Sequence, residues 1–256
     1  MLLLTTNHQS LIATKTSRIV KEAQGRPVME FGARRAHGIN AAVEGARAAI
    51  IGGAIGTSCT LSAKEFNVPA SGTMAHSWVQ SFDSEYEAFK TYAEIYPDDC
   101  TLLIDTYNTI ESGLPNAIKV FNEVLKPKGY KPKAVRLDSG DLAYLSKKVR
   151  KILDEAGYTE CKICATNSLD EYLIKSLIEQ DAKIDSFGVG ENLITAKSEP
   201  VFGGVYKLVG IEKDTKIIPK IKVSENVVKV TNPGFKKVYR FYDNESQKAI
   251  ADVIAL

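Results

Sequence analysis

The sequence has few cysteines and no excess of one charge, and both features limit the classes of protein to which it can belong. Its 256 residues include four cysteines and three histidines, and 33 basic residues nearly balance 31 acidic ones. Four scattered cysteines are too few for a disulfide scaffold. Because charges of both signs are mixed along the whole chain, there is no basic stripe of the kind that binds nucleic acid. We expect no nucleic-acid partner, and any anion site must be local.

Long apolar runs are also lacking. Residues 1–4 are apolar, but they are too few and lack the basic region of a signal peptide. No run approaches the about 20 residues that cross a bilayer. We therefore expect no membrane contact and a cytoplasmic location. A helix-like segment (7–23) opens the sequence and an apolar stretch (250–256) ends it, which indicates a piece of a longer protein.

Several catalytic signatures are missing as well. Neither the Walker pattern nor the Rossmann glycine pattern follows a predicted strand, and no G-x-S-x-G elbow occurs. Cys161-Lys-Ile-Cys164 has C-x-x-C spacing, but on a strand two thiols three residues apart point to opposite faces. We expect buried cysteines there rather than a redox or zinc site.

Short apolar runs alternate with amphipathic segments, which is typical of βα units around a parallel sheet or barrel. The predicted strands are 28–31, 50–53, 101–104, 133–137, 161–165 and 184–187, and the predicted helices are 36–49, 84–95, 115–125, 141–156 and 168–180. Later strand-like segments are 205–211, 217–223 and 236–242. We expect a helix in 1–27, an α/β barrel in 28–200 and part of a β-rich second domain in 201–256.

Polar or glycine-rich clusters follow nearly every predicted strand. They are residues 31–35, 56–58, 105–109, 136–141, 166–168 and 188–190. The loops after parallel strands converge on one face, where active sites gather. A shared mouth lined by these clusters favours a barrel over an open sheet, in which only a switch point would need them.

The cluster Arg136-Leu-Asp-Ser-Gly-Asp141 combines an arginine, two carboxylates and a flexible glycine. Arginine can grip a phosphate, and an aspartate can contact hydroxyls, a metal or a positively charged carbon. Such a group suits a phosphorylated sugar. The alternative is a helix N-cap formed by Asp138 or Ser139.

Three other loops carry candidate residues. Phe31 offers a ring for stacking, and Arg34 and Arg35 offer anion contacts. At the start of the predicted helix two cations would oppose the helix dipole, which favours a role in binding over a structural one. His76 lies among small residues, and Ser77 could orient it, whereas His8 and His37 are interpreted as structural. Gly188-Val-Gly190 resembles a phosphate cradle at the end of a strand.

Taken together, these loops strongly resemble those of the nicotinate phosphoribosyltransferase family in order and spacing. The matching motifs are Glu30-Phe-Gly-Ala-Arg-Arg-Ala36, Gly56-Thr-Ser58, Gly72-Thr-Met-Ala-His-Ser77, Leu103-Ile-Asp-Thr-Tyr-Asn-Thr109, Arg136-Leu-Asp-Ser-Gly-Asp141, Ser186-Phe-Gly-Val-Gly190 and Pro233-Gly-Phe-Lys236. The resemblance implies a type II phosphoribosyltransferase fold, an irregular parallel α/β barrel with a second domain. It also implies transfer of phosphoribosyl from 5-phosphoribosyl-1-pyrophosphate to nicotinate, coupled to ATP hydrolysis through a phosphohistidine.

The resemblance assigns roles to individual positions. His76 matches the histidine that ATP phosphorylates, and Asp105 and Asp138 resemble the acids around that histidine and the ribose. Residues resembling the family's substrate contacts are Phe31 (pyridine ring), Arg34 (phosphoribosyl donor), Arg136 (pyridine and its carboxylate), Ser139 and Gly140 (the same loop), Gly188 and Gly190 (5′-phosphate), and Thr166, Asn167 and Ser168 (the neighbouring loop).

The same resemblance implies partners beyond the chain. Mg²⁺ is the natural counter-ion of the donor pyrophosphate, although its ligands are not identified by the sequence. We expect a homodimer, in which an N-terminal segment of the family supplies an aromatic residue across the interface. That segment and the C-terminal part of the second domain are expected to lie outside this sequence.

Three alternatives stay open. The nicotinamide enzyme shares the fold and the histidine but carries an aspartate at the position of Ser58, where a hydroxyl can donate to a carboxylate. A quinolinate enzyme is disfavoured because the His76 loop has no purpose there. The third alternative is a barrel fragment that binds phosphates without catalysis.

Overall fold

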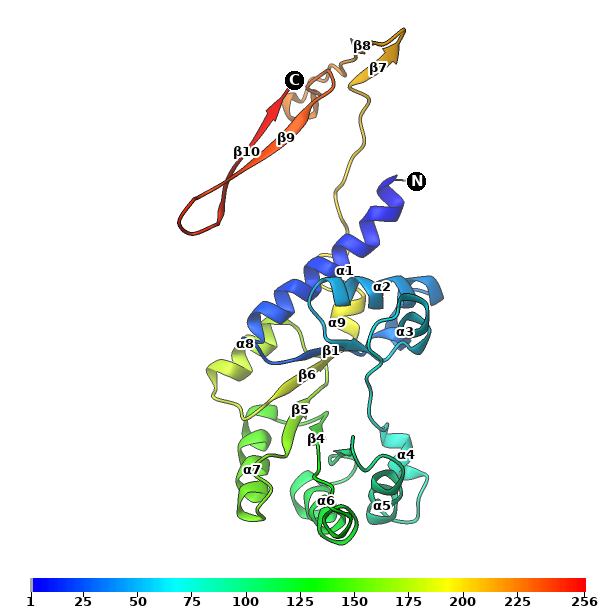
Figure 1. Ribbon diagram of the computed structural model, residues 1–256, viewed down its shortest axis with the longest axis vertical. Helices are drawn as coiled ribbons and strands as arrows, with labels where there is room; N and C mark the ends of the chain where they lie inside the picture. Colours follow the sequence, from blue (N-terminus) through cyan, green and yellow to red (C-terminus); the bar gives the residue numbers. More distant parts are fainter. Residues whose placement is uncertain (1) are drawn as a thin grey trace. The chain divides into compact units, whose positions relative to one another are not determined.

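The computed structural model describes residues 2–256, which form two compact units, the chain up to Phe202 and Gly203–Leu256. The first unit contains a six-stranded sheet with the strand order β2-β1-β6-β5-β4-β3, in which every pairing is parallel. Its strands are β1 (Val28–Glu30), β2 (Gly56–Thr57), β3 (Thr101–Leu103), β4 (Ala134–Leu137), β5 (Lys162–Ala165) and β6 (Ser186–Val189). Strands β2 and β3 are the two edges of this sheet. The strands between them, β1, β6, β5 and β4, follow one another in a curled half-barrel, so the expected parallel α/β architecture is confirmed (Figure 1).

Helices connect the strands of the first unit. They are α1 (Leu2–Glu22), α2 (Ile39–Ile51), α3 (Thr60–Phe66), α4 (His76–Gln80), α5 (Glu85–Ile95), α6 (Leu114–Val120), α7 (Leu142–Glu155), α8 (Glu171–Glu179) and α9 (Glu191–Ile194). Shorter 3₁₀ or π turns are η1 (Ala33–Arg35), η2 (Thr109–Gly113), η3 (Phe121–Leu125) and η4 (Lys126–Lys128). Helix α1 packs along α2 and α8 (Figure 1).

The amphipathic helices of the first unit bury one face each, against the sheet or against another helix. In α7 the buried positions Leu142, Ser146, Val149 and Leu153 recur every three or four residues, which is the spacing of one helix face. All of β3 is buried, as expected of a parallel strand covered on both faces. No helix among residues 2–256 is both long and apolar enough to cross a bilayer.

Two antiparallel hairpins make up the regular strands of the second unit. The first pairs β7 (Gly210–Lys213) with β8 (Lys216–Pro219), and the second pairs β9 (Lys237–Tyr242) with β10 (Ala249–Ala255); the 3₁₀ turn η5 (Val227–Lys229) lies between them. Arg240 and Asp252 form a two-pronged ion pair across the second hairpin, at 2.8 and 2.9 Å. The predicted β-rich character of this segment is confirmed.

Some predicted boundaries are wrong. Residues 50–53 were expected to form a strand, but Ile50 and Ile51 end helix α2, and the strand follows at β2. The helix continues because its face packs tightly on α1: a Cβ at Gly52 would lie 2.5 Å from the Ala13 carbonyl oxygen. The predicted strand 205–211 is displaced toward the C-terminus, because β7 begins only at Gly210 and continues to Lys213, and β10 was not expected.

All four cysteines are free and buried, as expected for the C-x-x-C pair. Burial raises the pKa of Cys100 and of Cys161 to about 12. Both thiols therefore stay protonated at neutral pH, which does not suit a redox or metal-binding role.

Candidate functional site

An open cavity of about 620 Å³ lies at the carboxyl ends of the parallel strands, where the polar loops were expected to meet. Most predicted site residues line it, namely Phe31, Arg34, Ser58, His76, Arg136, Asp138, Thr166, Asn167, Ser168, Gly188 and Gly190. Asp105, Ser139 and Gly140 are not among the lining residues. The convergence of loops that are far apart in sequence follows from the parallel strand order.

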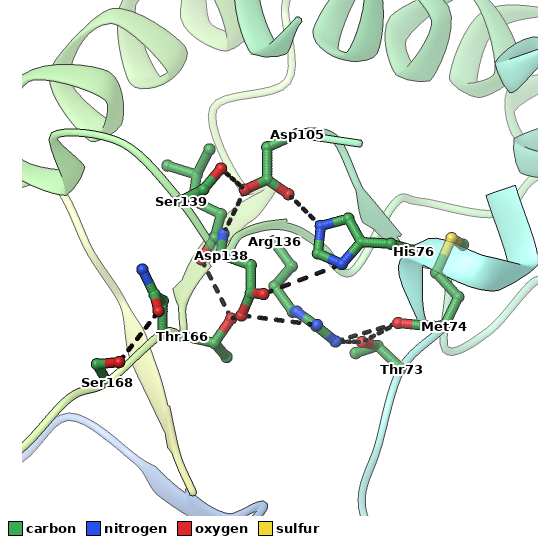
Figure 2. A network of polar contacts seen from close by, with 11 residues as sticks. Thr73, Met74, His76, Asp105, Arg136, Asp138, Ser139, Thr166 and Ser168 are labelled. Carbon is green, nitrogen blue, oxygen red and sulfur yellow. Dashed lines mark hydrogen bonds and ion pairs between the residues drawn. The ribbon is translucent and has the colours of Figure 1, made fainter. Parts of the chain in front are cut away.

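His76 stands between two carboxylates (Figure 2). It begins helix α4, and its Nε2 lies 3.3 Å from Asp105 Oδ1, while its Nδ1 lies 4.0 Å from Asp138 Oδ2. The Asp105 side chain is only 1% exposed, compared with 36% for His76. Asp105 therefore supports the histidine from behind the cavity wall rather than facing a ligand.

Asp105 also holds the loop after β4. Its Oδ2 accepts a hydrogen bond from the Asp138 backbone N–H at 2.8 Å and from the Ser139 hydroxyl at 2.6 Å (Figure 2). One buried carboxylate thus ties the His76 side chain to the backbone that carries Asp138. Ser139 serves this internal contact, which explains why it does not line the cavity.

Asp138 does not cap a helix. The N-cap of α7 is Asp141, which accepts from the Tyr144 N–H at 3.0 Å, so the alternative role for Asp138 or Ser139 is wrong. Instead, Asp138 Oδ1 accepts from the Thr166 hydroxyl. Gly140 has φ 76°, a conformation that favours glycine and lets the chain turn into the helix.

Arg136 links β4 to the loop that precedes His76 (Figure 2). Its Nη1 donates to the Thr73 hydroxyl and to the Met74 carbonyl oxygen, the latter at 3.1 Å, and its Nη2 lies 3.8 Å from Asp138 Oδ1. Its buried Nε has no hydrogen-bond partner among residues 2–256. The guanidinium is therefore anchored through Nη1, whereas Nη2 makes an ion pair but no hydrogen bond within residues 2–256 and keeps its donor capacity.

Phe31 packs on glycine backbone. A Cβ at Gly188 would lie 2.5 Å from two atoms of the Phe31 ring and 2.7 Å from Thr166 Cγ2. A Cβ at Gly190 would lie 3.2 Å from the Phe31 carbonyl oxygen. Of the two glycines predicted as a phosphate cradle, Gly188 thus makes room for the aromatic ring and Gly190 for the backbone of Phe31.

Arg34 and Arg35 lie in the 3₁₀ turn η1, whereas α2 begins only at Ile39. The helix-dipole argument for them is wrong, because neither lies at the start of an α-helix. Both still line the cavity. Arg35 Nε is 3.4 Å from Glu191 Oε2, and both side chains are about half exposed, so this ion pair is weak.

The loop after β5 has an unusual backbone. Asn167 and Ser168 have φ values of 86° and 50°, a conformation that few residues other than glycine adopt. Asn192, which is buried, donates from Nδ2 to the carbonyl oxygens of Ser168 and Leu169, at 2.7 and 3.1 Å. These bonds hold the loop in its curved form beside the cavity.

Several residues of the site were not predicted. Thr73, the Met74 carbonyl and Asn192 act through neighbours, and each stands inside or beside a motif that the sequence already marked. Hydrogen bonds between side chain and backbone in loops have no periodicity, so no sequence pattern signals them. The interpretation of His8 agrees with its position: it does not line the cavity, and burial lowers its pKa.

Among residues 2–256, no group of three or more His, Cys, Asp or Glu side chains could hold a metal ion. The chain therefore has no metal cage of its own in this part. Mg²⁺ commonly uses one or two carboxylates together with water and substrate phosphates. Asp138, which faces the cavity, fits that smaller contribution.

Known proteins resemble this chain closely. The profile of the Nicotinate phosphoribosyltransferase (NAPRTase) family matches residues 27–245. The nicotinate phosphoribosyltransferase of Bacillus subtilis (strain 168) is 52% identical over 250 residues, which cover 98% of this chain and 50% of that protein. The chain spans about half the length of the curated relatives it matches.

Two crystal structures are also similar to this chain. The crystal structure of human nicotinic acid phosphoribosyltransferase matches with a TM-score of 0.82 and 26% identity, covering 100% of this chain and 57% of that one. Nicotinate-nucleotide pyrophosphorylase from Pyrococcus furiosus matches with a TM-score of 0.64 and 31% identity, covering 74% of this chain and 48% of that one.

Proposed function

Because the chain belongs to the nicotinate phosphoribosyltransferase family, we propose that its protein transfers phosphoribosyl from 5-phosphoribosyl-1-pyrophosphate to nicotinate. The products are nicotinate mononucleotide, a precursor of NAD, and pyrophosphate. The observation that carries the proposal is one cavity that combines an aromatic ring, three arginines and a carboxylate. These groups match a planar anionic acceptor, a polyanionic donor and a positively charged transition state.

The acceptor site centres on Phe31. Its ring offers a face to the pyridine, and the Gly188 backbone behind it leaves no room for a side chain that would displace it. Arg136 supplies positive potential for the carboxylate of nicotinate, and Ser58 supplies a neutral donor.

The donor site uses the remaining cations and backbone. Arg34 and Arg35 lie on one turn and suit phosphate groups, for which arginine is well shaped. The curved backbone of Asn167 and Ser168, next to Gly190, suits the 5′-phosphate because backbone N–H groups in such curves can face an anion.

In the chemical step, the bond from ribose carbon 1 to the pyrophosphate oxygen breaks, and the pyrophosphate leaves with the electron pair. The lone pair of the pyridine nitrogen then forms the new carbon–nitrogen bond. Positive charge develops on the ribose between these events, and Asp138 is the carboxylate placed to stabilise it. Its contact with the Thr166 hydroxyl holds it in position before the charge appears.

Coupling to ATP through His76 is the second part of the proposal. With Asp105 accepting a hydrogen bond from Nε2–H, the lone pair of the ring lies on Nδ1, which can attack the terminal phosphorus of ATP. The bond from that phosphorus to its bridging oxygen breaks, and ADP leaves. A phosphate on His76 would add negative charge beside the donor site.

A bound Mg²⁺ would supply positive charge to the phosphates of the donor. Asp138 is the side chain of this chain that would contact it, with the other ligands coming from the donor phosphates and water. A homodimer and a cytoplasmic location belong to the same proposal, and sedimentation of the purified protein tests the first.

Product formation tests the proposed function. The protein would be incubated with the donor, Mg²⁺ and labelled nicotinate, with and without ATP, and nicotinate mononucleotide and pyrophosphate would be measured. We expect equal amounts of both products, and more of them with ATP. A preference for nicotinamide would instead support the nicotinamide enzyme, and donor binding without product would support a phosphate-binding fragment.

A further inference from the structure

Glu30 is a fully buried carboxylate at the end of β1, directly beneath two loops of the cavity. Its Oε1 accepts a hydrogen bond from the Gly32 N–H, and its Oε2 accepts one from the Thr57 hydroxyl at 2.6 Å. Its backbone carbonyl accepts the Ser58 N–H at 2.9 Å. One residue thus contacts the loop that carries Phe31 and the loop that carries Ser58.

The contacts continue past Glu30 on the Ser58 side. The Thr57 hydroxyl, while donating to Glu30, also accepts from the Cys59 N–H at 2.9 Å. Ser58 is therefore flanked by two residues that are fixed through the same carboxylate. On the other side, a Cβ at Gly32 would lie 2.8 Å from Glu30 Oε1, so the close approach requires glycine there.

A buried carboxylate is costly to the folded protein unless its oxygens are satisfied. Glu30 has no ion-pair partner among residues 2–256. The Gly32 N–H and the Thr57 hydroxyl, which donate hydrogen bonds to it, therefore offset the cost of burying the carboxylate. Burial raises the pKa of Glu30, and the bonds from Thr57 and Gly32 oppose that rise. The carboxylate is therefore held in place by the very loops that it joins.

We propose that Glu30 is a positioning residue that sets the spacing between the Phe31 ring and Ser58, and so controls affinity for the acceptor. This rests on the proposed function, in which these two residues contact the pyridine and its substituent. The loop of Asn167 and Ser168 is held separately by Asn192, so the donor phosphate contacts there do not depend on Glu30. Arg34 and Arg35 share the loop of Phe31, but that loop is tied to Glu30 through the Gly32 N–H, a bond that substitutions at Thr57 leave in place.

The sharpest test compares Thr57→Val with Thr57→Ser. Valine keeps the shape but removes the hydroxyl that satisfies Glu30, whereas serine retains it. Hydrogen bonds to charged groups are worth about 1.5–3 kcal/mol, which corresponds to roughly a ten- to hundredfold change. We expect KM for nicotinate to rise at least about tenfold in Thr57→Val, with KM for the donor changed less than about threefold, and near-normal values in Thr57→Ser.

Two further variants separate positioning from stability. In Glu30→Gln the amide oxygen can still accept from the Gly32 N–H, but an uncharged NH2 group faces the Thr57 hydroxyl, and the charge-assisted bond is lost. The KM for nicotinate should therefore rise in the same direction as in Thr57→Val, and the double variant should change it by less than the product of the two single changes. Glu85→Gln is the matched control, because Glu85 is also buried but contacts Ser112 and Asn116 outside the cavity. It should lower Tm without changing either KM.

Equal rises of both KM values, or a change in Thr57→Ser as large as in Thr57→Val, would overturn the inference. If the wild-type protein neither binds nor converts nicotinate, the proposed function fails, and amide exchange still decides the role of Glu30. Faster exchange at Gly32 and Ser58, whose N–H groups donate to Glu30, in Thr57→Val than in Thr57→Ser would then support the positioning role, and equal exchange would exclude it.

Discussion

Asp105 supports His76 from beneath the cavity: the two side chains meet at 3.3 Å, and nearly all of Asp105 is buried. The carboxylate accepts from Nε2 and thereby favours the tautomer whose lone pair lies on Nδ1. Because Asp105 also binds the backbone of Asp138, any change at Asp105 acts on both the histidine and the carboxylate of the cavity.

We expect His76→Ala to abolish stimulation by ATP while leaving slow transfer that does not need ATP. Alanine removes the nitrogen that would accept phosphate, but the acceptor and donor contacts remain. Initial rates with and without ATP, together with acid-labile phosphate on the protein, check this. ATP stimulation that persists in the variant would show that His76 is not the phosphate acceptor.

Asp138→Asn tests the carboxylate. Asparagine has nearly the same shape and can still accept from the Thr166 hydroxyl, but it carries no charge. Removing an electrostatic stabiliser commonly costs about a hundredfold or more in kcat, and we expect a loss of at least that size. A near-normal kcat would contradict the assignment, and Asp141→Asn, at the true N-cap of α7, is the control that should retain activity.

Ser58→Asp should change the choice of substrate. An aspartate would place a second negative charge beside the carboxylate of nicotinate, and like charges in a partly desolvated pocket repel by several kcal/mol, roughly. We expect nicotinate use to fall far more than donor affinity, with weak nicotinamide use appearing. Measuring kcat/KM for nicotinate and nicotinamide in the wild type and the variant checks this. An unchanged preference would mean that residues other than Ser58 determine the choice of substrate.

Gly188→Ala should displace the Phe31 ring. The added methyl would stand 2.5 Å from two ring atoms, far inside van der Waals contact. Overpacking of this kind typically costs about 1–3 kcal/mol, and the ring can relieve it only by moving. We expect a higher KM for nicotinate and a lower Tm. Gly72→Ala, where a Cβ meets no atom within 4 Å, should leave Tm unchanged.

Alkaline pH should destabilise the fold through Cys100 and Cys161. Their pKa values rise from 9.0 to about 12 on burial, so between these values the unfolded chain loses thiol protons that the folded chain keeps. Since the unfolded state then binds fewer protons, stability falls as pH rises through this window. Tm measured from pH 8 to 10.5 should decrease, and the decrease should be smaller in the double variant Cys100→Ala, Cys161→Ala.

Much of this fold is predictable because buried parallel strands have a simple sequence pattern, a short apolar run followed by a polar loop. The runs around Leu102, Val135 and Ile163 are mostly apolar, and each is followed by a polar loop. The wrongly predicted strand at residues 50–53 shows where this pattern is not sufficient. Ile50 and Ile51 suit a strand or a helix end equally well, and packing against α1 selects the helix.

The residues that line the cavity could be predicted from the sequence more readily than the residues that support them. Arg136, Asp138 and His76 are residue types that often bind ligands or take part in catalysis, which marks them in a sequence. Glu30 carries charge as well, but its contacts with Gly32 and Thr57 depend on β1 lying beside β2. Such contacts cannot be read before the strand order is known.

A polypeptide that leaves the ribosome exposes β1 long before β6 exists. Val28 pairs with Phe187, and the Phe31 N–H donates to the Val189 carbonyl, so the walls of the cavity join only after most of the first unit has been made. Pairings this distant in sequence form slowly, and the free edge of β1 can meet other chains in the meantime. No ligand of the cavity can stabilise the nascent chain during that interval, because the two walls of the cavity have not yet met.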